Sequence, residues 1–249
     1  THHARRRVLW RTGRGGRRYA SAAVGTVLWL ASPCAATVYE VGPGRPYATL
    51  DAIPWHVLTT GDMVRIHARP EPYREKIVVG GRGSDAAPIV IQGVADPEGR
   101  LPVIDGENAT APSGLDGLTL DRAVVQIGGR ATDATRPPEH IVIENLDIRG
   151  GRPPFTFIDG AGARHAYTNY AAAVWIESGR HLVLRGCRLH DCGNGVFVSP
   201  ANGTTGDVRI EHCEVFNNGN PGSVFEHNAY TECDGILFQY NRFGPLRPG

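Results

Sequence analysis

Side chains that could do chemistry are densest near the end of the chain. Residues 227–234 read His-Asn-Ala-Tyr-Thr-Glu-Cys-Asp, and two arginines follow at Arg242 and Arg247. A histidine or tyrosine can remove a proton, while an arginine or a calcium ion held by carboxylates can neutralise an acid group. Together these residue types suit removal of a proton that lies next to a carboxylate.

Each residue of this cluster can be given a role in that chemistry. The candidate catalytic residues are His227, Tyr230 and Arg242. The candidate substrate-binding residues are Asn228 and Arg247. The candidate ligands for Ca²⁺ are Asp191, Glu232 and Asp234. The alternative is structural, because asparagine and histidine at the corners of a repeating fold satisfy the backbone groups of turns.

A second candidate site lies at Tyr73-Arg74-Glu75-Lys76. If Arg74 and Lys76 are exposed, both can bind a carboxylate of the substrate. The alternative is that they are solvated charges flanking a strand, with Tyr73 at the start of that strand.

The part of the chain that must position these residues repeats itself. Four eight-residue segments share apolar residues at their first, third and eighth positions: 141–148, 182–189, 208–215 and 236–243. The last three begin 26 and 28 residues apart, and the first begins 41 residues before the second. The long polar and aromatic loop 149–169 accounts for the wider gap.

Apolar residues at the first and third positions predict a strand with one buried face. A self-similar unit of roughly 20–30 residues cannot bury that face alone and must stack on its neighbours. We therefore expect an all-β fold, a right-handed parallel β-helix, rather than an antiparallel sandwich. The sixth positions should then form one inward-facing ladder, made of Leu146, Cys187, Cys213 and Asn241.

The first 36 residues are typical of an export signal. Seven arginines between residues 5 and 18 precede a small and apolar run, and Ala36 ends a small-residue cleavage site. We expect residues 1–36 to be removed and residues 37–249 to act outside the cytoplasm, secreted or periplasmic, without stable membrane insertion. A disordered basic tail and a nucleic-acid-binding arm are alternatives, but nothing downstream supports a nucleic-acid partner.

Loss of the seven arginines leaves the mature chain net acidic, so an acidic polymer would need local basic clusters or a bridging cation. Four cysteines remain after cleavage. Either Cys192 and Cys233 form a disulfide, which export permits, or the thiols are free and buried.

The two ends of the solenoid are expected to differ. A short helix around Thr49–Leu58 should cap the first coil, because a solenoid needs a terminal cover. The sequence stops at "FGPLRPG" directly after a coil strand, with no recognisable cap. We expect that the C-terminal coils are missing, or that this uncapped coil associates end to end with another chain.

The stretches "GPGRPYATLDAI", "TTGDMVRI", "PYREKIVV" and "APIVIQG" resemble the first coils of the pectate-lyase-like superfamily. The resemblance covers residues 38–249 and implies the β-helix fold. It also implies a substrate among acidic polysaccharides, with a polysaccharide lyase as the favoured activity. A uronate epimerase, a non-catalytic carbohydrate-binding or cell-surface β-helix and an inactive truncated product are the alternatives. Hydrolysis ranks lower because no doubled aspartate is present.

Overall fold

The computed structural model describes residues 36–113, 115, 120–129, 136–199 and 205–248. The chain divides into two units, Thr1–Cys34 and Ala35–Gly249, and all described residues belong to the second. The expected export signal therefore lies outside the described residues, apart from Ala36.

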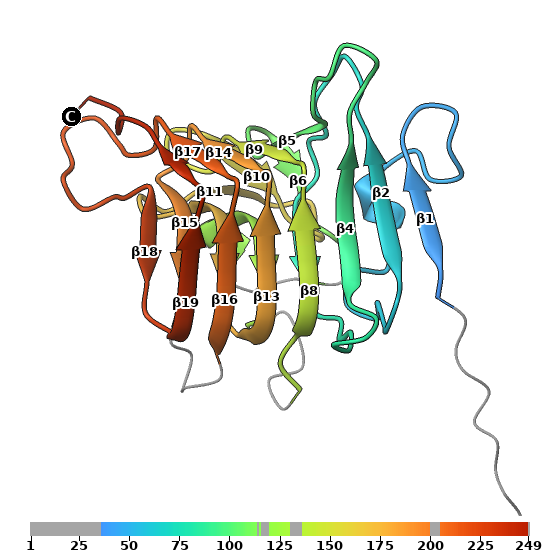
Figure 1. Ribbon diagram of the computed structural model, residues 1–249. Helices are drawn as coiled ribbons and strands as arrows, with labels where there is room; N and C mark the ends of the chain where they lie inside the picture. Colours follow the sequence, from blue (N-terminus) through green and yellow to red (C-terminus); the bar gives the residue numbers. More distant parts are fainter. Residues whose placement is uncertain (1–35, 114, 116–119, 130–135, 200–204, 249) are drawn as a thin grey trace, which may run out of the picture. The chain divides into compact units, whose positions relative to one another are not determined.

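Parallel strands dominate the described chain and form three sheets that the chain visits in turn (Figure 1). The first sheet contains β1 (Val38–Val41), β2 (Met63–His67), β4 (Ile89–Val94), β8 (Glu139–Glu144), β13 (Gly179–Arg185), β16 (Thr205–Glu211) and β19 (Asp234–Gln239). The second contains β5 (Val103–Asp105), β9 (Asp147–Arg149), β14 (Arg188–His190), β17 (Glu214–Phe216) and β20 (Arg242–Phe243). The third contains β3 (Ile77–Val79), β7 (Ala123–Ile127), β12 (Ala172–Ile176), β15 (Asn194–Val198) and β18 (Ala229–Thr231).

A fourth, smaller sheet holds β6 (Ala109–Thr110), β10 (Thr156–Ile158) and β11 (Arg164–Ala166). Strands β10 and β11 form an antiparallel hairpin within the long loop that the sequence analysis placed at 149–169. Two of its aromatic residues, Phe157 and Tyr167, are buried over the coil beneath. Packing rather than ligand exposure therefore explains these two side chains.

The register between coils follows the sequence repeat residue for residue. Leu182 pairs with Ile141 on one side and Val208 on the other, and Val208 pairs with Ile236. The eighth positions also align, since Leu189 lies between Ile148 and Val215. These pairings confirm the prediction of a parallel β-helix.

The inward ladder predicted from the sixth positions is also present. Leu146, Cys187 and Cys213 are buried in the core. Asn241 continues the ladder, because its Oδ1 accepts a hydrogen bond from the Cys213 backbone N–H at 2.9 Å. Among the described residues all four cysteines are free thiols, so the Cys192–Cys233 disulfide is not formed in this structure.

The N-terminal segment departs from the expected helix. Only Leu50–Ala52 (η1) is helical, as a single 3₁₀ turn, and Ile53 is already extended. Pro54 lacks the N–H that a longer helix would require. The segment still contributes to the core, because Leu50 and Trp55 are buried and the Trp55 indole donates to the Leu50 carbonyl at 2.9 Å. A second 3₁₀ turn, η2, spans Leu120–Arg122.

Candidate functional site

The cluster predicted between residues 227 and 234 is spread along the edge of the third sheet. Tyr230 projects from β18 and stacks on Phe197 of β15, with ring centroids 4.7 Å apart. Its hydroxyl donates to Glu232 at 2.6 Å, and this hydrogen bond raises the pKa of Tyr230. A phenol held in its protonated form is a poor base. The His227 ring lies 5.9 Å from the Tyr230 ring.

Asp191 and Arg247 meet at the corner that follows the second sheet. The Arg247 guanidinium donates to Asp191 at 2.6 Å, and Asn217 donates to the same carboxylate oxygen at 2.7 Å. The other carboxylate oxygen of Asp191 forms a hydrogen bond with Nδ1 of His190 at 2.7 Å. Both predicted site residues are therefore occupied by structural contacts of this corner.

Asn228 lies beside the core of the last coil. Its amide donates to the Gly244 carbonyl at 2.9 Å and accepts from Asn218 at 3.0 Å. These bonds match the structural alternative in which corner asparagines satisfy turn backbone. Asn228 and His227 also border a cavity of about 510 Å³.

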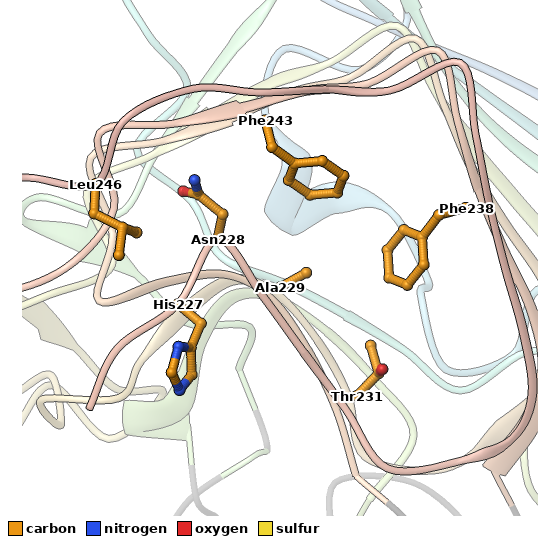
Figure 2. A pocket seen from close by; sticks show the side chains of 7 residues that line it. All are labelled: His227, Asn228, Ala229, Thr231, Phe238, Phe243 and Leu246. Carbon is orange, nitrogen blue, oxygen red and sulfur yellow. The ribbon is translucent and has the colours of Figure 1, made fainter. Parts of the chain in front are cut away.

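This cavity lies beside the last coil of the described solenoid core. Figure 2 shows Phe238 and Phe243 pointing into the space that the last coil encloses, whereas the His227 ring points away from it. Phe238 pairs with Ile210 and Phe243 with Val215, and both partners are fully buried one coil earlier. The apolar lining therefore continues the core and does not form a polar ligand site.

The remaining predicted residues lie on other faces. Arg242 projects from β20 of the second sheet and lies 3.5 Å from Glu214, with 81% of its side chain exposed. Arg74 lies beside the same sheet, 3.8 Å from Asp105. Asp234 begins β19 in the first sheet. Arg242 and Asp234 therefore do not join His227 and Tyr230 in one site.

Lys76 was expected to be exposed, and the structure buries it. Its ammonium lies over the rings of Phe157 and Tyr167, at 4.2 and 4.3 Å from their centroids. It donates to the Ala123 carbonyl and, at 3.2 Å, to the Tyr167 hydroxyl. Burial lowers the pKa of Lys76 well below its usual value. This residue cannot contact a polymer in the described arrangement.

The predicted calcium ligands do not converge. Asp191 is held by Arg247 at the corner after the second sheet, whereas Glu232 and Asp234 flank the turn between β18 and β19. Within the described ranges no three histidine, cysteine, aspartate or glutamate side chains are placed to share a metal ion. The residues present therefore do not fit the expected Ca²⁺ site.

A polar groove on the outer face of the first sheet was not predicted. It has a volume of about 260 Å³ and crosses three neighbouring strands, β8, β13 and β16. The ionisable residues that line it are Asp85, His140, His181, Arg185, Asp207 and Arg209. This groove brings bases and arginines together, which is the combination predicted for residues 227–247.

The bases of the groove form one row across three coils. The rings of His140 and His181 stack with centroids 4.5 Å apart and planes inclined by 14°. On the next coil, the Asp207 carboxylate forms a hydrogen bond with Nδ1 of His181. A carboxylate can only accept, so Nδ1–H of His181 is the donor and Nε2 of the neutral ring keeps its lone pair. In this tautomer Nε2 of His181 is able to accept a proton.

The two arginines of the groove differ in how firmly they are held. Arg185 donates to Glu211 at 2.7 Å and to Glu144 at 3.4 Å, so it is fixed between two acids. Hydrogen bonds from Arg185 and Gln239 lower the pKa of Glu211. Arg209 is half exposed and lies 4.0 Å from Glu211. It is therefore the arginine with more freedom to meet an anion in the groove.

A signal for this row was present in the sequence. His140, His181 and Asp207 each precede the first residue of a repeat copy, namely Ile141, Leu182 and Val208. Extending the alignment of the copies by one residue would have shown a polar column there. All three residues have positive φ, between 50° and 56°, in the left-handed region that histidine and aspartate visit more readily than most residues.

Comparison with known families supports the architecture. Residues 128–244 match the family model described as the right handed beta helix region. Together with the strand register this confirms the expected right-handed parallel β-helix. No curated protein matches the sequence. None of the helical segments in the described ranges has the length and apolar character needed to cross a membrane.

Proposed function

We propose that this chain is an exported carbohydrate-active protein that cleaves an acidic polysaccharide by β-elimination, with the first-sheet groove as its active site. The observation that carries the proposal is the His181–Asp207 pair, which lies in the same groove as Arg209. The groove crosses three coils, so an extended polymer can lie along the solenoid. Export rests on the composition of residues 1–36.

Arg209 is assigned to the carboxylate of the sugar that is cleaved. An arginine beside this group stabilises the negative charge that develops when the neighbouring proton leaves. Arg185 is committed to Glu144 and Glu211, so it shapes the groove and leaves the substrate to Arg209. The groove also contains Asp85 and Asp207, so the substrate must form close contact with Arg209 rather than be drawn in by a strong positive field.

His181 is assigned as the base. Its Nε2 accepts the proton from carbon 5 of the uronate, next to the carboxylate. The electron pair of that C–H bond forms a double bond between carbons 4 and 5. The bond from carbon 4 to the glycosidic oxygen breaks, and this oxygen takes up a proton to leave as an alcohol. Asp207 acts as a positioning residue that fixes the ring and stabilises the imidazolium.

A non-catalytic polysaccharide-binding solenoid is the second candidate function. Arginines on the outer face of the second sheet favour it: Arg149, Arg188 and Arg242 are 38%, 46% and 81% exposed. They pair with acids in an alternating row, for example Arg188 with Asp147 at 2.9 Å. An epimerase shares the proton abstraction and is distinguished by its product.

The test is an incubation of the full-length protein with a panel of polyuronates. Elimination creates an unsaturated uronate that absorbs ultraviolet light, so the absorbance increase measures the reaction. We expect an increase that His181→Gln abolishes while the circular dichroism and melting temperature stay unchanged. Binding without an absorbance change, by folded protein, would favour the second candidate. Inversion at carbon 5 without chain cleavage would indicate an epimerase.

A further inference from the structure

The stereochemistry of the sugar that this groove can cleave follows from the placement of its two histidines. His140 and His181 project from neighbouring strands of one sheet, and their rings are nearly parallel, 4.5 Å apart. Both therefore approach a bound sugar from the floor of the groove. The argument rests on the proposed function, because it concerns the same site and reaction.

Elimination moves two protons, and the floor of the groove constrains both. One proton leaves carbon 5, and another is delivered to the glycosidic oxygen on carbon 4. His181 accepts the first at Nε2. The second comes from the stacked His140, which lies on the same side of the sugar ring as His181. Proton and leaving group must then depart from the same face, which is a syn elimination.

Only some uronates present these two groups on one face. In D-glucuronate and D-mannuronate the hydrogen on carbon 5 and the oxygen on carbon 4 lie on the same side of the ring. Inversion at carbon 5 gives L-iduronate and L-guluronate, and inversion at carbon 4 of glucuronate gives D-galacturonate. In these three sugars the groups lie on opposite sides, so a base and an acid on opposite faces are required.

We propose that the first-sheet groove cleaves chains at D-glucuronate or D-mannuronate residues, by syn elimination with His140 and His181 as the proton-transfer groups. The other ionisable residues of the groove fit this assignment. Asp207 is bonded to His181, and Arg185 is held between two acids. Asp85 lies in the turn before β4 and is the other acid among the described residues that line the groove. Asp85 is therefore the residue to test for proton transfer by a group other than the two histidines.

The experiment compares two pairs of polymers. Polymannuronate and polyguluronate differ at carbon 5, whereas glucuronan and polygalacturonate differ at carbon 4 and at the anomeric carbon. The full-length protein is incubated with polymannuronate and polyguluronate, and separately with glucuronan and polygalacturonate, while ultraviolet absorbance is followed. We expect a rate on mannuronate or glucuronate at least about tenfold above that on the epimer, and loss of this activity in His140→Gln and His181→Gln. Asp85→Asn should keep the preference.

The outcomes separate the inference from the function beneath it. Activity confined to guluronate or galacturonate would overturn syn elimination and leave the lyase proposal standing. Syn elimination would also be overturned if Asp85→Asn lost most of the rate while His140→Gln kept full activity. The group that protonates the glycosidic oxygen would then be Asp85, which does not project from the same sheet as the two histidines. If folded protein gave no increase in ultraviolet absorbance with any of the four polymers, the lyase proposal itself would be rejected.

Discussion

Asp207 lies opposite His181 on the neighbouring coil, and its carboxylate holds Nδ1 of the imidazole. The repeat places the two residues in register, since Leu182 pairs with Val208 directly after them. A base–carboxylate pair on an outer face is not needed for the core of a solenoid. We therefore infer that the His181–Asp207 pair has a functional role.

His181→Gln should lower the rate of elimination by about 10²–10⁴-fold, which is the usual contribution of a general base. Asp207→Asn should cause a smaller loss and change the pH profile, because Asp207 acts through the imidazole. Initial rates across pH measure both effects. His212→Gln is the matched control, since His212 is exposed on a turn and stacks on Tyr240. Equal losses in the control would show that the effect is not specific.

Arg209 and Arg185 should respond differently to the same substitution. Arg209→Gln should reduce kcat/KM with little change in melting temperature, because Arg209 is half exposed and only loosely paired. Arg185→Gln should destabilise the fold by about 1–3 kcal/mol, because it leaves the buried Glu211 without its main donor. Kinetics and denaturant titration separate the two. The assignment fails if Arg209→Gln unfolds the protein and Arg185→Gln does not.

Burial of Lys76 should make the free energy of unfolding depend on pH in the alkaline range. Burial lowers its pKa well below the ordinary 10.5, so the unfolded chain binds a proton that the folded chain lacks. The free energy of unfolding therefore increases with pH between the pKa of Lys76 in the folded state and 10.5. Lowering the pH through the same window removes this stabilisation. In Lys76→Met this slope should be absent. Parallel stability curves for the two proteins would contradict the lowered pKa of Lys76.

His190 should stabilise the fold in its charged form. Burial opposes the charge, but hydrogen bonds with Asp147 and Asp191 outweigh it and raise the pKa of His190 above 6.5. This stabilisation is complete below 6.5 and is lost as pH rises through the folded pKa. His190→Gln should therefore cost about 1–3 kcal/mol in acid and less at higher pH. A cost independent of pH would mean that the charge plays no part.

The apolar end of the last coil should promote association of this chain. Phe238 and Phe243 are 38% and 48% exposed, and beside them the strand edges of β18, β19 and β20 are unpaired within the described residues. We expect concentration-dependent self-association in sedimentation experiments, and its suppression by Phe243→Glu. Exposed Val57→Glu is the control substitution away from this coil. Identical sedimentation of the wild type and Phe243→Glu would exclude this face as the contact.

The coils were predictable because their evidence is local and repeated. Four copies with apolar first, third and eighth positions set the register, and the structure pairs them accordingly. Burial of Lys76 was not predictable, because its partners Phe157 and Tyr167 come from the distant loop 149–169, and Tyr167 is 91 residues away along the chain. The candidate cluster failed to assemble for a related reason. Residues close in sequence at a corner, such as Tyr230 and Asp234, project from different sheets.

The most direct measurement is the yield of unsaturated uronate from polymannuronate and glucuronan with three proteins: wild type, His181→Gln, and the double variant His227→Gln/Tyr230→Phe. We expect product from the wild type and the double variant, and none above background from His181→Gln, with all three proteins equally folded. Product from His181→Gln, with loss in the double variant, would contradict it and return the active site to the edge of the third sheet.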